Sequence, residues 1–175
     1  MSKTEEIEDL LVCDHLSGLD FSWVSRDEVE QPYRELLCHR RDMTSSLARF
    51  HQGEVSLEIF TQQEEAGFYR REVLLRVGAK PVEYGMIRIF LSEFSDEVKD
   101  EILKGQRPLG TILNESGLSY SSRPGGFLRI PGSSFEPNFF PSSGGGFLFG
   151  RYNELLGPDA QVLARIIEIL PREKS

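Results

Sequence analysis

The sequence has few of the residues that build metal sites and disulfide frameworks. Among 175 residues there are two cysteines, Cys13 and Cys38, and three histidines, and neither cysteine belongs to a CxxC pair. Zinc sites need such ligands grouped at short, recognisable spacing. We therefore expect a reduced protein without a disulfide, a metal or a cofactor.

Long apolar runs and positive charge are also missing. No segment reaches the roughly 20 apolar residues of a membrane span, and the N-terminal MSKTEEIEDL is acidic, unlike a secretory signal or transit peptide. A net charge of −8 provides no basic field for nucleic acid or anionic membranes. We expect a cytoplasmic protein that binds neither of them. An anionic ligand would then have to be held by a few cations inside a pocket.

What is present is the composition of a globular domain, with 39% hydrophobic and 27% charged residues. Residues 1–25 read as a polar lead-in and residues 26–175 as a single domain. Apolar residues at helical spacing predict helices from about residue 26 to 37, from Thr44 as N-cap to Gly53, over 95–104 and over 108–117. The oligomeric state is not readable.

Alternating apolar and polar residues predict strands in EVSLEIFT (54–61), 68–77 and 82–91, which short connections would join as an antiparallel meander. The run 161–171 predicts a last strand beside that meander. Between the meander and this last strand, frequent proline, glycine and serine residues predict a loop-like chain after Arg123. Residues 131–146 are predicted to be an inserted loop, which is either an ordered flap or a plain insertion. This order of elements predicts an α+β fold.

Two charged residues fall on apolar strand faces. Arg71 shares one strand face with Tyr69, Val73 and Leu75, which is the apolar face, so its side chain should point inward. Glu168 lies among aliphatic residues of the last strand. A buried charge is costly unless it is paired. The two side chains therefore either form an internal ion pair or belong to a pocket in which Arg71 clamps a carboxylate and Glu168 exchanges a proton.

Several stretches together resemble the chorismate lyase (chorismate pyruvate-lyase) family. They are LLCHRRDMTSSLARFHQGEVSLEIF (36–60), YRREVLL (69–75), PVEYGMIRI (81–89) and GQRPLGTIL (105–113), with a weaker return at EILP (168–171). The resemblance covers about residues 30–120. It implies a six-stranded antiparallel sheet with helices that cover an enclosed ligand pocket. Effector-binding domains of some bacterial transcription regulators share that fold and perform no chemistry.

The resemblance also implies roles for residues of this chain. Arg71 would grip a substrate carboxylate, Glu168 would be the acidic catalytic group, and Met43 and Leu109 would shape the cavity. FLFGRYNELL (147–156) resembles the strand pair that ends in Gly-Arg, so Arg151 is a further substrate-binding candidate, the other reading being a solvated arginine at a strand end.

The implied activity is a carbon–oxygen lyase that converts chorismate to 4-hydroxybenzoate and pyruvate by cofactor-independent elimination, in ubiquinone or phenolic compound biosynthesis. Three alternatives stay open. The first is a non-catalytic sensor of aromatic acids, although about 25 residues before the first clear helix are too few for a winged helix. The second is a scaffold in which Arg71 and Glu168 merely pair. The third is an enzyme acting on another aromatic acid.

Overall fold

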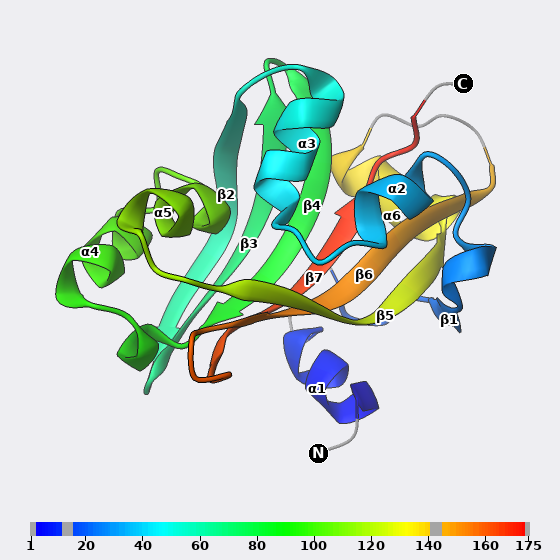
Figure 1. The fold of residues 1–175 in the computed structure, drawn as a ribbon. Coiled ribbons are helices and arrows are strands. Elements are labelled where there is room, and N and C mark those ends of the chain that lie inside the picture. The colour runs from blue at the N-terminus through cyan, green and yellow to red at the C-terminus, as the bar shows by residue number, and fades with distance from the viewer. Residues whose placement is uncertain (1–2, 12–15, 141–144, 174–175) are drawn as a thin grey trace.

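The computed structural model describes residues 3–11, 16–140 and 145–173. Its strands form one antiparallel sheet in the order β1-β5-β6-β7-β4-β3-β2 (Figure 1). The strands are β1 (Ser22–Val24), β2 (Val55–Glu65), β3 (Phe68–Val77), β4 (Lys80–Ile89), β5 (Ser121–Pro131), β6 (Phe147–Leu156) and β7 (Val162–Leu170). The α+β fold is confirmed, but the sheet has seven strands where six were expected.

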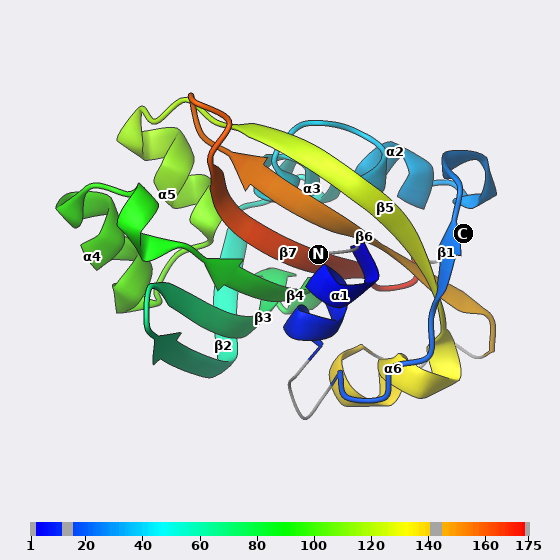
Figure 2. The ribbon, with the colours of Figure 1, turned by 90° about the horizontal axis from the view of Figure 1, so that it is seen from below.

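Helices lie on both faces of this sheet (Figure 2). The α-helices are α1 (Lys3–Leu10), α2 (Tyr33–Leu37), α3 (Met43–His51), α4 (Asp96–Lys104), α5 (Leu109–Ser116) and α6 (Gly132–Phe139), and the 3₁₀ turns are η1 (Arg26–Glu28) and η2 (Leu91–Glu93). Within the described residues, no helix is long and apolar enough to cross a membrane.

The meander β2-β3-β4 and the last strand were predicted correctly. Strand β7 pairs with β4 on one side and with β6 on the other, which makes it the central strand of the sheet. Side chains on both of its faces are buried in hydrophobic clusters, Ile167 and Ile169 in one and Ile166 in another, and this explains why Val162–Leu170 reads as a nearly continuous apolar run.

The helix predicted over 95–104 is also correct, because its termini carry strong local signals. The Ser95 side chain accepts a hydrogen bond from the Val98 amide, and Gly105 ends α4 at a positive φ of 66°. At α3 the prediction was wrong by a few residues. Asp42, not Thr44, caps the helix through a 2.8 Å hydrogen bond from the Ser45 amide, and Gln52 takes the left-handed conformation expected of Gly53.

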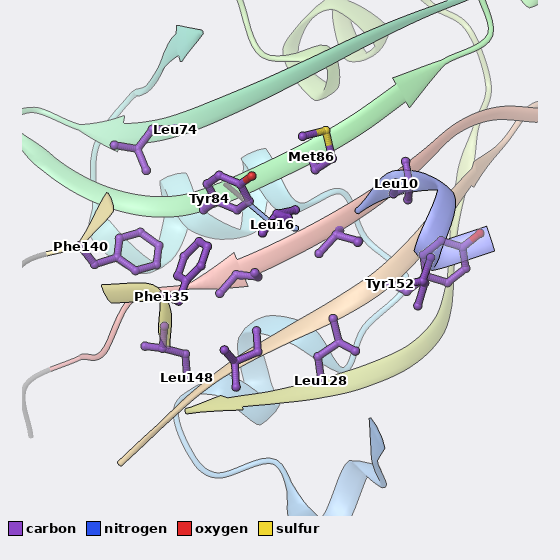
Figure 3. Close-up of a cluster of buried hydrophobic side chains, with 14 residues drawn as sticks. Leu10, Leu16, Leu74, Tyr84, Met86, Leu128, Phe135, Phe140, Leu148 and Tyr152 are labelled. Carbon is purple, nitrogen blue, oxygen red and sulfur yellow. The ribbon is translucent and has the colours of Figure 1, made fainter. Parts of the chain in front are cut away.

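One face of the sheet is covered by α1 and α6, which enclose a cluster of buried side chains (Figures 2 and 3). The predicted polar lead-in thus contains a helix that packs on the sheet, and Cys13 lies outside the described residues. Ile7 and Leu10 are each 1% exposed, and Asp9 forms an ion pair with Arg88 of β4. Residues that looked merely polar form an amphipathic helix once a sheet face is available to cover its apolar side.

The stretch expected as a loop after Arg123 is mostly regular structure. Strand β5 pairs along its length with β6, and a register shift between Pro124 and Gly126 accommodates the proline that argued against a strand. Helix α6 follows at once, and its Phe135 is fully buried against Tyr84. The prediction of an inserted loop over 131–146 was therefore wrong for 132–139, where the structure has helix α6. Residues 141–144 lie outside the described part.

Candidate functional site

Helices α3 and α5 lie on the other face of the sheet (Figure 1). A pocket lies beneath their first turns. Its volume is about 60 Å³. Strands β2, β3, β4, β6 and β7 form the floor. Helix α6 packs on the opposite face, so the segment 132–139 does not cover this pocket.

The roof is formed by two of the residues that the resemblance singled out. Met43 begins α3 and Leu109 begins α5, and both line the pocket while being only 4% and 6% exposed. The two helices approach closely because residue 110 is glycine. A Cβ at Gly110 would lie 2.9 Å from Thr44 Oγ1 and 3.1 Å from Asp42 Oδ1. The sequence thus encodes a tight contact between the two roof helices.

A second glycine leaves room in the floor. Gly85 of β4 pairs with Glu168 of β7. A Cβ at Gly85 would lie 3.1 Å from Val73 Cγ2 and 3.5 Å from Glu83 Oε1. Because no side chain stands there, the space between Val73 and Glu83 stays open to a ligand.

Arg71 points into the pocket from β3, on the face that strand alternation indicated. It is 2% exposed, and its Nη2 donates a hydrogen bond of 3.4 Å to the Arg107 carbonyl. Nε and Nη1 have no hydrogen-bond partner among the described residues. Burial lowers the pKa of Arg71, yet a guanidinium stays charged in proteins. The pocket therefore contains a cation with two N–H donors to spare.

Glu168 also lines the pocket and is 3% exposed, but its partner is not Arg71. Arg151 of β6, its neighbour across the strand pair, donates from Nε to Glu168 Oε2. Arg151 is fully buried, which excludes a solvated arginine at a strand end, and it does not line the pocket. Glu168 therefore does form an internal ion pair, as one interpretation of the sequence expected, but its partner is Arg151 and not Arg71.

Two polar residues of the floor were missed from the sequence. Glu83 of β4 is 4% exposed, and its Oε2 atom has no hydrogen-bond partner in the described chain. Burial raises the pKa of Glu83 well above its ordinary value, and the charge of Glu168 adds to this, whereas Arg151 opposes it. Asn153 of β6 donates to Ser122 Oγ at 3.2 Å, while its Oδ1 is buried without a partner among the described residues.

A signal for Glu83 was present in the sequence. In PVEYGMIRI, Glu83 shares a strand face with Gly85 and Ile87, so it is a carboxyl on an otherwise apolar face, as Glu168 is in the last strand. The same alternation argument that found Arg71 would have found Glu83. Asn153 gave no comparable signal, because Asn side chains are mostly exposed in proteins and an outward-facing Asn is the ordinary expectation.

Taken together, the pocket offers a cation, a carboxyl group that favours its protonated form and an amide oxygen, set among aliphatic side chains of the floor. Such a site can bind a small organic anion and orient it through one or two further polar groups. Apolar side chains dominate the walls of the pocket, and its polar groups come from three different strands, Arg71 from β3, Glu83 from β4 and Asn153 from β6. Both features are typical of a ligand-binding pocket.

Comparison with known proteins supports the fold. No family model matches the sequence, and no curated protein matches it. Gene product SA0254 from Staphylococcus aureus is similar in structure, with 12% identity, a TM-score of 0.52, and coverage of 74% of this chain and 87% of that one. PhnF from Mycobacterium smegmatis is similar at 11% identity and a TM-score of 0.51, with coverage of 97% and 94%.

This chain shares the fold of SA0254 and PhnF. A transcriptional regulator of the GntR family from Bacillus cereus also matches, with 14% identity, a TM-score of 0.44, and coverage of 70% of this chain and 99% of that one. At such low sequence identities the similarity concerns the fold alone. Evidence on a ligand has to come from the pocket residues of this chain.

Proposed function

We propose that this chain is a ligand-binding domain whose pocket takes up a small organic anion and releases it unchanged. The observation that carries the proposal is Arg71, a buried cation with two N–H groups that no described residue satisfies. An unpaired buried charge is strongly unfavourable. A carboxylate or phosphate group would accept one hydrogen bond from Nε or Nη1 and a second from the adjacent Nη2, which the 3.4 Å bond to the Arg107 carbonyl leaves with a further N–H, in the bidentate geometry that suits a guanidinium.

The size and lining of the pocket restrict the ligand. A volume of about 60 Å³ suits a compact acid, and a larger ligand requires the first turns of α3 and α5 to separate. Val73, Ile87 and Leu155 would contact its apolar body. Glu83 and Asn153 would then select for a polar substituent at the end away from the anionic group.

Lyase activity on chorismate is the second candidate. It is supported by the presence of Arg71 and Glu168, the two residues that the family resemblance implicates, in one pocket. Glu168 already accepts a hydrogen bond from Arg151, however, and a carboxylate held in that way is a poor group to move a proton during elimination. For this reason we place ligand binding without chemistry first.

A sensor of this kind acts through a partner that responds to the bound state. In the regulators whose effector-binding domains share this fold, the partner is a DNA-binding domain. The expectation that nucleic acid is not bound rests on the net charge of −8 and concerns these 175 residues alone. We therefore propose that the chain reports ligand binding to a DNA-binding partner rather than contacting DNA itself.

The test is a thermal-shift titration with chorismate, 4-hydroxybenzoate, benzoate and inorganic phosphate, run on the wild type, Arg71→Met and Arg76→Met. Arg76 is the matched control, since it lies on the same strand but pairs with Glu58 at 2.8 Å outside the pocket. We expect one or more anions to raise the melting temperature of the wild type and of Arg76→Met only. A ligand at 100 times its Kd stabilises by about 2.7 kcal/mol.

Chromatography of the chorismate sample decides between the two candidates. Unchanged chorismate together with a thermal shift supports a sensor, whereas release of 4-hydroxybenzoate, lost in Arg71→Met, would establish the lyase. An anion that stabilises Arg71→Met as well as the wild type would contradict both, because Arg71 would then not be the anion site.

A further inference from the structure

The buried arginine behind the pocket has contacts that ligand binding alone does not require. Arg151 donates from Nε to Glu168, and from Nη1 to two backbone carbonyls, those of Leu37 at 3.1 Å and His39 at 3.0 Å. One guanidinium therefore holds a pocket carboxylate on one side and the chain between α2 and α3 on the other. In sequence, this chain segment lies more than a hundred residues away from Arg151.

The segment in question, residues 37–42, joins the pocket to the protein surface. Its last residue, Asp42, caps α3 and lines the pocket, and Met43 follows directly in the roof. In its middle, Arg40 and Arg41 are exposed. From residue 38 to 42 the segment has no regular secondary structure. Its shape therefore depends on a few individual contacts.

Only a few hydrogen bonds among the described residues hold the backbone of this segment. The Cys38 amide donates to the Arg34 carbonyl at 3.0 Å, and the Arg41 amide donates to His39 Nδ1 at 3.1 Å. The Asp42 carbonyl accepts from Ser46 Oγ at 2.9 Å, and Arg151 supplies the two carbonyl contacts from inside. Burial and the charge of Arg151 lower the pKa of His39 to about 4. His39 thus stays neutral at ordinary pH and its Nδ1 remains available as an acceptor.

We propose that Arg151 is a positioning residue that couples Glu168 in the pocket to the segment 37–42. Its guanidinium is fully buried, Glu168 is the carboxylate that balances its charge, and Nη2 has no partner in the described chain. A ligand whose hydroxyl or other donor group hydrogen-bonds to Glu168 and draws it away leaves this guanidinium without its counter-charge. The guanidinium then shifts, and the two carbonyls that it holds move with it.

This coupling deepens the proposed function, because it gives the pocket a route to the surface at Arg40 and Arg41. Its test does not need a ligand. Glu168→Gln keeps the shape of the side chain but removes its charge, which imitates the loss of the ion pair. Arg151→Lys keeps the charge, but a single ammonium lacks the planar fork that reaches the carboxylate and both carbonyls at once.

The measurement is amide hydrogen exchange, followed by mass spectrometry on peptides that cover residues 36–43, with a peptide from α4 as internal control. We expect exchange in 36–43 to become about tenfold faster in Glu168→Gln and in Arg151→Lys, with α4 unchanged. The double variant should be no faster than the faster single variant, because both changes break the same connection.

Two results would overturn the coupling. Unchanged exchange at 36–43 in Glu168→Gln would show that the segment does not respond to the pocket carboxylate. Equal acceleration in α4 would show a general loss of stability in place of a local connection. Neither result bears on whether an anion binds at Arg71, and failure of the anion titration would leave the exchange result as it stands.

Discussion

Replacing Arg71 by methionine is expected to stabilise the ligand-free protein while it removes anion binding. Methionine keeps an unbranched apolar stem in the pocket and discards the guanidinium. The substitution removes one hydrogen bond to the Arg107 carbonyl, which at 3.4 Å is a long one, and the interaction of the guanidinium with the Tyr69 side chain, whose ring centroid lies 6.0 Å away. It also relieves the protein of a buried charge that no described carboxylate pairs.

The gain in stability follows from the unsatisfied groups. Nε and Nη1 are two buried donors without partners among the described residues, and each costs at least about 1 kcal/mol. Arg71→Met should therefore stabilise the protein by about 2 kcal/mol or more. For a chain of this length that is a rise in melting temperature of about 4–8 °C. Arg76→Met, at a half-exposed ion pair, should change stability by less than about 1 kcal/mol.

Differential scanning calorimetry without added anions, in a buffer free of phosphate and carboxylates, measures both values. A lower melting temperature for Arg71→Met than for the wild type would contradict this expectation. It would mean that the folded protein compensates Arg71 internally, so that the pocket is not an anion site waiting for its ligand.

Three further outcomes are expected. The first concerns Glu83, whose raised pKa means that the folded protein keeps a proton that the unfolded chain loses above about pH 4.5. The free energy of unfolding should therefore fall as the pH rises above about 4.5, by up to about 1.4 kcal/mol per pH unit. Glu83→Gln should thus melt higher than the wild type at pH 8 and equal to it at pH 4; a lower melting temperature at pH 8 would argue against the raised pKa. Gly110→Ala places a Cβ 2.9 Å from Thr44 Oγ1 and should cost about 1–3 kcal/mol in urea unfolding, whereas Gly145→Ala, with nothing within 4 Å, should be nearly neutral. Leu10→Ala should cost about 2–5 kcal/mol because Leu10 is 1% exposed; a loss no larger than that of Glu8→Ala at an exposed position of α1 would show that this helix does not belong to the core.

The sequence was most informative where structure depends on neighbours along the chain. Alternation assigned Arg71 and Glu168 to buried faces, and the signals at Ser95 and Gly105 bounded α4. It failed where a segment depends on a distant partner. Helix α1 is stable only against the sheet face that it covers, and strand β5 tolerates its proline and glycines because β6 pairs with it throughout.

Local pattern was enough to identify Arg71 and Glu168 as buried charges, since side-chain alternation is a property of each strand alone. The pairing of Glu168 with Arg151 and not with Arg71 could not be read in this way, because it depends on strand order and register. In this sheet β6 lies beside β7, whereas β3 is separated from β7 by β4. Arg71 is consequently left without a carboxylate partner among the described residues, and the proposed anion site rests on this cation.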